Sequence, residues 1–238
     1  MPLNVNSHST TESCGEIMGT ERLSRPEVSV IDYSVGNIGA LLNMFDHLGI
    51  EAEAVSDERG ILDASRLVLP GIGAFDRAMR TLADRGLVAS LNEAVIARRT
   101  PVLGVCLGMQ LLARQSAEGK LPGLGWIAAD VLRIEVPPSS ALKVPHIGWS
   151  DVRPAAVQSL FIPTDTADEP ERFYFDHGYH VVCEEASDIA ATFEYGRTLC
   201  CAVQRGHIAG VQFHPEKSHR FGMRLLEAWA RSPGRTQR

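Results

Sequence analysis

The chain has 238 residues, of which 45% are hydrophobic and 22% are charged, with a formal net charge of −6. This is the composition of a soluble globular protein, and the acidic balance without a basic stripe argues against a nucleic-acid partner. No apolar run is long enough to span a membrane, no signal peptide is recognisable, and five cysteines without framework spacing favour a reducing, cytoplasmic location.

Residues 1–26 are rich in Ser, Thr, Glu and Asn and show no hydrophobic periodicity, so we expect a flexible extension. Val28–Ile31 then predicts a first buried strand. Apolar residues at helical spacing from Ile38 to Leu48 predict a helix, which Gly49 ends.

Arg66–Leu69 predicts another buried strand, and apolar positions from Leu87 to Val95 predict a second helix. Strand and helix alternate through the first half of the chain. This order predicts an α/β fold of three layers, with an open, mostly parallel sheet and helices on both faces.

The next strand, Pro101–Val105, leads directly to Cys106 and then to a predicted helix from Leu107 to Ala113. A nucleophile between Gly104 and Gly108 at a strand-to-helix turn is the pattern of a nucleophile elbow, with Cys in place of Ser. Side chains at the two glycines would collide with the neighbouring strand or helix. The helix N-terminus would favour the thiolate. The alternative is a buried structural cysteine.

The second half of the chain has short strand-like runs separated by turns, such as Arg172–Phe175 and Asp188–Phe193. They predict an antiparallel extension of the sheet. Residues 154–170 are polar and predict a loop, and apolar positions from Phe221 to Trp229 predict a closing amphipathic helix.

A base for the cysteine is found near the C-terminus. Ile208–Phe213 predicts a strand, and His214 follows at its end, where catalytic groups collect in open α/β sheets. Glu216 can accept a proton from one imidazole nitrogen and leave the other free for Cys106. The alternative is that both are solvated loop residues. The remaining histidines show no metal-ligand spacing and the glycine-rich turns match no phosphate-binding loop, so we expect neither metal nor cofactor.

Cys106–Gln110 together with His214–Glu216 resembles the class I (triad) glutamine amidotransferases, and among them the glutaminase subunits of imidazole glycerol phosphate synthase. The resemblance extends from Val28 to the last helix and implies a glutamine amidotransferase domain at residues 27–238. Four further segments carry it: Ile31–Asn37, Leu69–Phe75, Lys143–Trp149 and His214–Ser218.

The resemblance implies hydrolysis of glutamine to glutamate and ammonia. Cys106 would attack the amide carbon, His214 would transfer protons, and Glu216 would orient His214. The oxyanion donors would come from the backbone of Leu107 and from the turn formed by Gly71, Ile72 and Gly73. Without the cysteine motif, that turn would be interpreted as a plain strand-to-helix connection.

Gln110 lies about one helical turn after Cys106. In the family, the residue at this position contacts substrate glutamine. The alternative is that Gln110 is an ordinary polar residue on the exposed face of the helix. His177, Gly178 and Tyr179 resemble the segment that binds the amino-acid end of the substrate. His-Ser-Tyr is usual there, so Gly178 weakens glutamine binding if a serine hydroxyl is needed. Asp176 and Ser150 also depart from the expected Val and Asn.

The family forms a heterodimer with a (β/α)₈-barrel synthase subunit, which receives the ammonia through a tunnel and makes imidazole glycerol phosphate and AICAR from PRFAR in histidine biosynthesis. Low activity of the isolated chain is therefore expected. The residues implied at this interface are Asn37, Pro145, His146, Gly148, Trp149 and Lys217. A packed core position is the alternative for Trp149.

Three alternative functions share part of this sequence pattern. Residues 214–219 and 221–226 also resemble paralogues of surface-polysaccharide clusters, which would deliver ammonia to a sugar-modifying enzyme. Peptidases and chaperone-like hydrolases use elbow cysteines too, but His214–Glu216 and Gln110 argue against them. A non-catalytic binding module is disfavoured because Cys106, His214 and Glu216 are all present.

Overall fold

The computed structural model describes Met1, residues 26–155 and residues 171–232. The expected N-terminal extension and most of the loop predicted at 154–170 lie outside the described residues, so both stay predictions. Within the described residues, no helix is long and apolar enough to cross a membrane.

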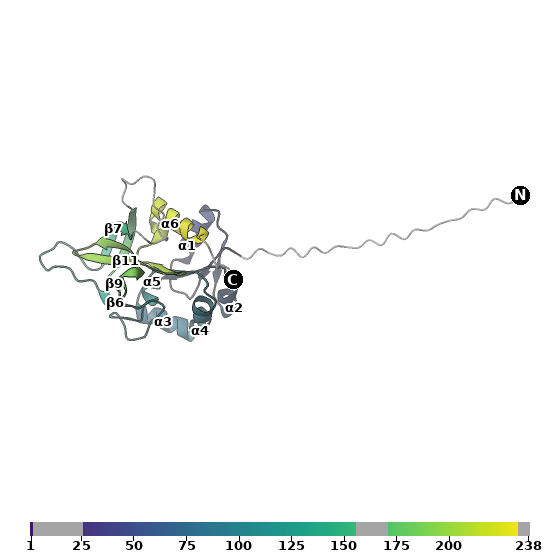
Figure 1. The fold of residues 1–238 in the computed structure, drawn as a ribbon, viewed down its shortest axis with the longest axis horizontal. Helices are drawn as coiled ribbons and strands as arrows, with labels where there is room; N and C mark the ends of the chain where they lie inside the picture. The colour runs from purple at the N-terminus through teal and green to yellow at the C-terminus, as the bar shows by residue number, and fades with distance from the viewer. Residues whose placement is uncertain (2–25, 156–170, 233–238) are drawn as a thin grey trace.

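A nine-stranded sheet forms the centre of the molecule (Figure 1). Its five neighbouring strands at one side run parallel, and the four that follow pair antiparallel. The predicted parallel sheet with an antiparallel extension is therefore confirmed. The strands in spatial order are β2 (Ala52–Val55), β1 (Val28–Ile31), β3 (Leu67–Gly71), β4 (Val102–Cys106), β12 (Ile208–Val211), β11 (Thr198–Arg205), β10 (Ile189–Glu194), β7 (His146–Pro154) and β8 (Glu171–His177).

A second, three-stranded sheet is built from β5 (Gln115–Ser116), β6 (Ala129–Arg133) and β9 (Tyr179–Cys183). β9 follows β8 after a single residue, Gly178, so the chain passes from the large sheet to the small one at that residue. The predicted substrate segment lies at this passage.

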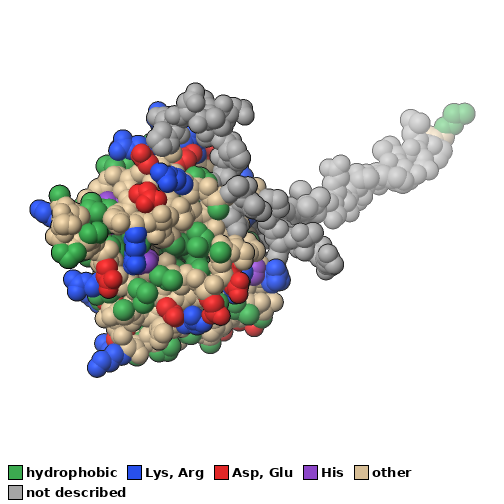
Figure 2. All heavy atoms as spheres, turned by 60° about the vertical axis from the view of Figure 1, so that its left-hand side comes forward, with side chains coloured by type: hydrophobic (Ala, Val, Ile, Leu, Met, Phe, Trp, Pro, Cys, Tyr) green, Lys and Arg blue, Asp and Glu red, His purple; other side chains and the backbone are tan. Residues whose placement is uncertain are grey.

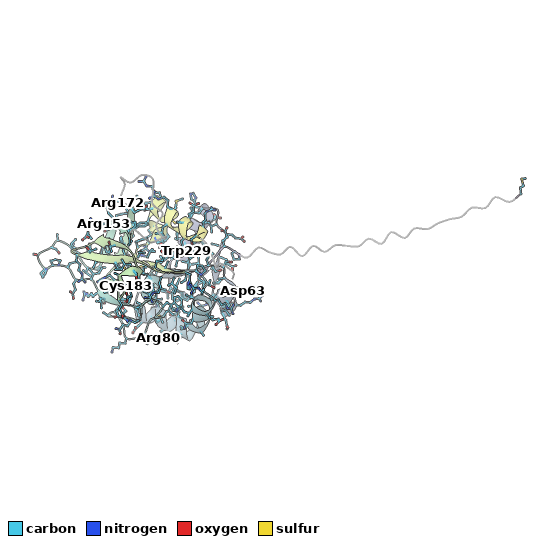
Figure 3. The ribbon with its side chains drawn as sticks, in the orientation of Figure 1. Asp63, Arg80, Arg153, Arg172, Cys183 and Trp229 are labelled. Atoms are coloured by element: carbon cyan, nitrogen blue, oxygen red, sulfur yellow. The ribbon has the colours of Figure 1, made fainter. Side chains whose placement is uncertain are left out.

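Helices cover both faces of the large sheet, and Figure 1 shows α1 and α6 on one side with α3 and α4 on the other. The first face carries α1 (Ile38–His47) and α6 (His219–Arg231). Trp229 of α6, labelled in Figure 3, is buried in the core on this face. The other elements are α2 (Glu58–Asp63), α3 (Phe75–Asp84), α4 (Leu87–Asn92) with a π-helical continuation η1 (Glu93–Ala97), α5 (Leu107–Leu111), and two 3₁₀ turns, η2 (Ala186–Asp188) and η3 (Pro215–Lys217).

Successive side chains of a buried strand point to opposite faces of the sheet, so each strand contributes to two separate hydrophobic cores. On β4, Leu103 and Val105 pack in the core beneath α1 and α6, whereas Val102 packs in the core beneath α3 and α4. On β3, Val68 faces the first core and Leu69 the second. Apolar runs that predicted buried strands are thus explained by burial on both faces.

Several predicted boundaries differ from the structure. The predicted second helix is in fact preceded by α2 and α3, and the prediction omitted β2 as well. α5 ends at Leu111 rather than at Ala113, and β12 ends at Val211 because the chain turns toward η3. α2 is only six residues long and is held by the Asp57 side chain, which accepts from Gly60 N–H at 2.8 Å.

Candidate functional site

Cys106 lies at the sharp turn between β4 and α5, with φ 55° and ψ −111°. A non-glycine residue in this region is strained, and such strain collects at functional sites. A Cβ on Gly104 would lie 2.7 Å from Gly108 O, and one on Gly108 would lie 1.8 Å from Leu69 O of β3. Backbone therefore packs on backbone at both glycines, as the elbow pattern predicts.

The sheet brings His214 to Cys106. β4 and β12 are parallel neighbours with Val105 opposite Val211, so the chain leaves both strands at the same edge. His214 Nδ1 lies 2.8 Å from Glu216 Oε1, and these side chains are 4% and 2% exposed. The Nε2 atom is therefore the one left to face Cys106.

The charge state of His214 follows from these neighbours. Burial alone would lower the pKa of His214, but hydrogen bonds with Cys106 and Glu216, together with their charges, raise it to about 10. At neutral pH the imidazole of His214 is therefore protonated, and it lies between the Cys106 sulfur and the Glu216 carboxyl group.

The turn that carries His214 is tied to the edge strand β8 by a buried serine. Ser218 Oγ donates to His214 O at 2.6 Å and accepts from Tyr174 N–H at 3.0 Å. The N–H of His214 in turn donates to Tyr174 O at 2.9 Å. The sequence analysis assigned no role to Ser218, although a serine four residues after a backbone carbonyl can reach back to it.

A cavity of about 450 Å³ opens in front of Cys106. It brings together most of the predicted catalytic, oxyanion and substrate residues, and two that were placed at the partner interface, Pro145 and Lys217. It is lined by Ile72, Gly73, Cys106, Leu107, Gln110, Glu118, Pro145, Asp176, His177, Gly178, Tyr179, His214 and Lys217.

The turn after β3 lies beside the elbow. Gly71 pairs with Cys106 across β3 and β4, and a Cβ on Gly71 would lie 2.8 Å from Gly108 N. Gly73 has φ 87°, a conformation that favours glycine, and Ile72 is half exposed. The predicted oxyanion segment thus lies next to the nucleophile, and nothing lies within 4 Å of a Cβ on Gly73.

Glu118 is a lining residue that the sequence analysis missed. Its Oε2 accepts from Phe75 N–H at 2.9 Å, at the start of α3. The neighbouring loop is held by Asp76, whose carboxylate accepts from Lys120 N–H and Leu121 N–H. Glu118 thereby joins the loop after β5 to the turn that contains Gly73 and places a carboxylate at the cavity.

Gln110 is buried rather than exposed. Its Nε2 donates to Tyr179 O at 3.3 Å and to Gln212 Oε1 at 3.0 Å. Gln212, which the sequence analysis left without a role, is fully buried, and its Nε2 donates to Cys106 Sγ at 3.8 Å. The sequence does carry a signal for Gln212, because it is a polar residue near the end of an otherwise apolar predicted strand.

His177 contacts Tyr179 O through Nδ1 at 2.7 Å. Burial lowers the pKa of His177 to about 3, so its imidazole is neutral. Because a carbonyl oxygen only accepts, Nδ1 carries the hydrogen and Nε2 is left as an acceptor. This Nε2 has no hydrogen-bond partner among the described residues.

The residues predicted at a partner interface divide into two groups. Trp149 is 39% exposed and stacks on His219 at 5.6 Å between ring centroids, so it is not a core residue; Ile147 beside it is 60% exposed. Asn37 and Lys217 are also exposed. His146 is buried, 4.1 Å from the Tyr195 ring centroid and with Nε2 2.9 Å from Ser150 Oγ, so its side chain offers no surface to a partner.

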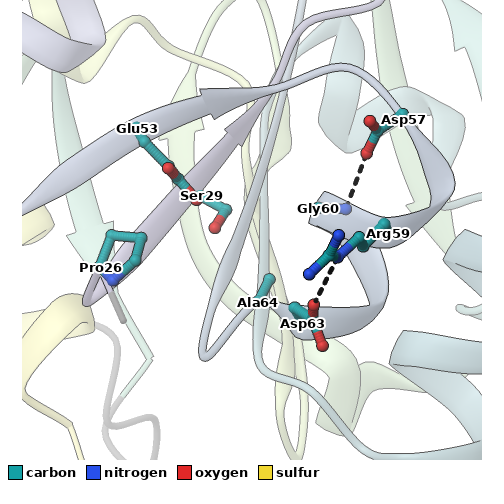
Figure 4. Close-up of a pocket in the computed structure, with 8 residues that line it drawn as sticks. All are labelled: Pro26, Ser29, Glu53, Asp57, Arg59, Gly60, Asp63 and Ala64. Atoms are coloured by element: carbon teal, nitrogen blue, oxygen red, sulfur yellow. Dashed lines mark hydrogen bonds and ion pairs between the residues drawn. The ribbon is translucent and has the colours of Figure 1, made fainter. Parts of the chain in front are cut away.

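Two further surface features carry no chemistry of this kind. A hollow of about 230 Å³ at the edge of the sheet (Figure 4) is lined by Pro26, Ser29, Glu53, Asp57, Arg59, Gly60, Asp63 and Ala64, without a cysteine or histidine. Figure 2 shows basic and acidic side chains interspersed on the face drawn. In the part of the chain that the structure describes, no group of three His, Cys, Asp or Glu residues is placed to hold a metal ion.

Comparison with known proteins gives a consistent result. The family described as glutamine amidotransferase class-I matches residues 29–231. The imidazole glycerol phosphate synthase subunits HisH 2 of Methanococcus maripaludis and of Pseudomonas aeruginosa are 44% and 46% identical, and each alignment covers 84% of this chain and 96% of the relative. Subunit HisH of Leptospira interrogans is 40% identical over 85% of this chain and 98% of its own length.

Solved structures share the fold at much lower identity. PurLQS from Thermotoga maritima matches with a TM-score of 0.63 at 17% identity, over 87% of this chain and 98% of that one. The glutaminase domain of Trypanosoma brucei CTPS, solved with bound acivicin, matches with a TM-score of 0.57 at 16% identity, over 85% and 93% of the two chains.

Proposed function

The chain belongs to the class I glutamine amidotransferases, a family of enzymes, and from this premise we propose that it hydrolyses glutamine to glutamate and ammonia with Cys106, His214 and Glu216. The strongest support is the buried series from Glu216 through His214 to the strained elbow of Cys106. Nucleophile, base and orienting group lie in the order that covalent acyl transfer requires.

In the proposed reaction the Cys106 thiolate attacks the side-chain amide carbon of glutamine. The His214 imidazolium gives its proton to the departing nitrogen, so ammonia leaves and a glutamyl thioester remains. His214 then takes a proton from water, whose oxygen attacks the thioester carbon, and glutamate leaves as Cys106 is restored. Glu216 keeps Nδ1 of the ring occupied and stabilises its positive charge throughout.

The tetrahedral intermediates carry negative charge on the former amide oxygen. We assign its donors to the backbone N–H of Leu107 and to the turn of Gly71, Ile72 and Gly73, both next to Cys106. Tyr33 OH donates to Pro70 O at 2.7 Å in a buried contact, which fixes the start of that turn.

The cavity has a size suited to one amino acid. Gln110 is assigned to substrate glutamine, and its side chain lies beside Tyr179, to whose carbonyl oxygen it donates. His177, Gly178 and Tyr179 are assigned to the amino-acid end. The carboxylate of Glu118 is a suitable partner for the α-ammonium group.

We further propose that the chain is the glutaminase subunit of an imidazole glycerol phosphate synthase. It would pass ammonia to a (β/α)₈-barrel subunit that makes imidazole glycerol phosphate and AICAR from PRFAR in histidine biosynthesis. Support comes from relatives of that name at 40–46% identity over nearly their whole length. The exposed apolar side chains of Ile147 and Trp149, close in sequence to the cavity residue Pro145, would suit such a partner.

The test is glutaminase activity of the chain alone, with the barrel subunit, and with the barrel subunit and PRFAR. We expect low activity alone and strong activation by the pair. Cys106→Ala should abolish synthesis from glutamine while synthesis from added ammonia survives. Equal loss of both would contradict ammonia transfer, and absence of glutamine hydrolysis by the wild-type pair would contradict the function itself.

A second acceptor is worth testing because residues 214–219 and 221–226 resemble paralogues of surface-polysaccharide clusters. His219, the residue that follows the Lys217–Ser218 pair, lies at the surface and stacks on Trp149. It would therefore be available to a partner. Activation by a sugar-modifying synthase, and not by the barrel subunit with PRFAR, would support this alternative.

A further inference from the structure

Ser218 stands at the N-terminal end of α6, yet its hydroxyl does not cap that helix. A serine at this position ordinarily accepts a hydrogen bond from a backbone N–H of the first helical turn, and the side chain of Ser218 makes no such bond. The residue is completely buried. Its Oγ donates to His214 O at 2.6 Å and accepts from Tyr174 N–H at 3.0 Å. The hydroxyl is therefore committed to the turn that carries His214.

The second partner of this hydroxyl lies on the edge strand β8. Both backbone groups of Tyr174 face the turn, because its N–H donates to Ser218 Oγ and its carbonyl accepts from His214 N–H at 2.9 Å. In an antiparallel edge strand, every second residue directs both of these groups away from the neighbouring strand. His214 and Ser218 take the place of a further strand at this residue, and the turn is thereby fixed to the sheet.

The direction of each hydrogen bond follows from the chemistry of the groups. His214 O can only accept and Tyr174 N–H can only donate, so the hydroxyl proton of Ser218 points to His214. His214 O also accepts from Lys217 N–H at 3.1 Å. The backbone of His214 is thus held at its N–H and at its carbonyl, and Ser218 supplies the side-chain contact.

Backbone and side-chain contacts of His214 fix different parts of the residue. Glu216 Oε1, at 2.8 Å from Nδ1, limits the rotation of the ring. Ser218 and Tyr174 fix the backbone from which the ring extends, so a displaced turn would move Nε2 relative to Cys106 even with Glu216 in place. Ser218 does not line the cavity, and it would therefore influence a substrate only through His214.

Building on the proposed glutaminase function, we propose that Ser218 is a positioning residue whose hydroxyl holds the backbone of His214 so that the imidazole meets the Cys106 sulfur during proton transfer. Proton transfer needs the two heavy atoms within hydrogen-bond reach, so a small displacement of the ring is enough to slow it. Loss of the hydroxyl should slow the reaction and leave the binding of glutamine unchanged.

The first test measures kcat and the KM for L-glutamine with the full chain and its synthase partner. Ser218→Ala and Ser218→Gly both remove the hydroxyl, and we expect kcat to fall by about tenfold in each while KM stays unchanged. The two variants also separate positioning from helix capping, because glycine replaces a capping serine at little cost whereas alanine does not. A role in capping would therefore affect Ser218→Ala alone.

Leu226→Val is the matched control for loss of packing. Leu226 is a fully buried residue of α6, so the variant should lower the free energy of unfolding without changing kcat. Wild-type kcat in both hydroxyl-free variants, a loss confined to Ser218→Ala, or a matching loss in Leu226→Val would each overturn the proposal.

The second test needs no glutamine. The rate at which iodoacetamide alkylates Cys106, followed by mass spectrometry, reports on the imidazole beside the sulfur, because a nearby cation favours the reactive thiolate. Ser218→Ala should slow this alkylation, and it should have no further effect in a His214→Ala background, because its effect passes through His214. Alkylation of Cys183, which is partly exposed, is the internal control and should not change.

The two tests also separate this proposal from the proposed function. Unchanged alkylation of Cys106 in Ser218→Ala would overturn the positioning role even in an active enzyme. Failure of the wild-type pair to hydrolyse glutamine would instead overturn the proposed function, and the alkylation rates would still decide whether Ser218 positions His214.

Discussion

His214 Nδ1 and Glu216 Oε1 are 2.8 Å apart in a site where both side chains are almost completely buried. The second carboxylate oxygen of Glu216 has no hydrogen-bond partner among the described residues. In the proposed mechanism, Glu216 would therefore orient the imidazole through one oxygen.

Replacing Glu216 should cost less than replacing His214. Glu216→Gln keeps an oxygen that can accept from Nδ1, so we expect kcat to fall less than it does in His214→Ala. His214→Ala removes the proton carrier and should lower kcat by about 1,000-fold or more. Steady-state glutaminase assays of both variants with the partner present decide the order. A larger loss in Glu216→Gln would contradict the roles assigned here.

The strain at Cys106 predicts that two thiol-free variants differ in stability. Both Cys106→Ala and Cys106→Gly remove the nucleophile, but glycine adopts φ 55° without steric cost. The free energy of unfolding should therefore be about 1 kcal/mol higher for Cys106→Gly than for Cys106→Ala. Urea unfolding measures both. Equal stability would mean that the turn stores no strain at this residue.

The packing of the elbow predicts a severe effect of one added methyl group. In Gly108→Ala the new Cβ would lie 1.8 Å from Leu69 O, a backbone atom that can move only with β3, so we expect destabilisation of at least about 3 kcal/mol. Gly39→Ala on α1 is the matched control, because nothing lies within 4 Å of that Cβ. It should stabilise by about 0.5–1 kcal/mol. Similar unfolding curves for the two variants would refute the steric account.

The raised pKa of His214 predicts a loss of stability at alkaline pH. The folded state holds this proton up to a pKa of about 10, whereas the unfolded state releases it near 6.5. The stabilisation is therefore complete below pH 6.5 and is lost as pH rises toward 10. Urea unfolding at several pH values should show the decline. Cys106→Ala removes one of the raising partners and should make the decline shallower.

Gly178 stands where the family usually has serine, so Gly178→Ser tests whether a hydroxyl at this position strengthens glutamine binding. A Cβ there would lie 3.8 Å from Pro145 Cβ and from Val144 Cγ1, which is ordinary contact, so Gly178→Ser should fold normally. If the serine hydroxyl binds glutamine, the KM should fall by about tenfold, whereas Gly178→Ala should leave it unchanged. An unchanged KM in both variants would indicate that this segment binds through its backbone.

The parallel half of the fold was predictable because its strands are continuous apolar runs, each followed by a turn. β2 was not, since of its four residues only Val55 is buried. α3 was missed although Phe75, Ala78, Met79 and Leu82 follow helical spacing and are all buried. The signal for α3 is therefore present in the sequence.

The residues of the candidate site also differ in whether the sequence alone identifies them. Cys106, His214 and Glu216 belong to short motifs whose chemistry can be recognised from residue types and spacing. Gln212 and Ser218 acquire their roles from partners far away in sequence, Gln110 and Tyr174, and nothing local identifies those partners. Likewise, sequence alone did not distinguish the inward-facing His146 from the exposed Trp149 on the same strand.

The pairing of β4 with β12 also has a consequence for biosynthesis of the protein. Cys106 ends β4, but the strand that aligns with it, and the His214 that follows, come from the far end of the chain. A ribosome exposes the cysteine long before its base has been translated, and this long-range parallel contact cannot form until then. During translation Cys106 therefore lacks its proposed base until residues 208–214 have been made and have paired with β4. On the proposed mechanism, a chain that stops before His214 would have no glutaminase activity.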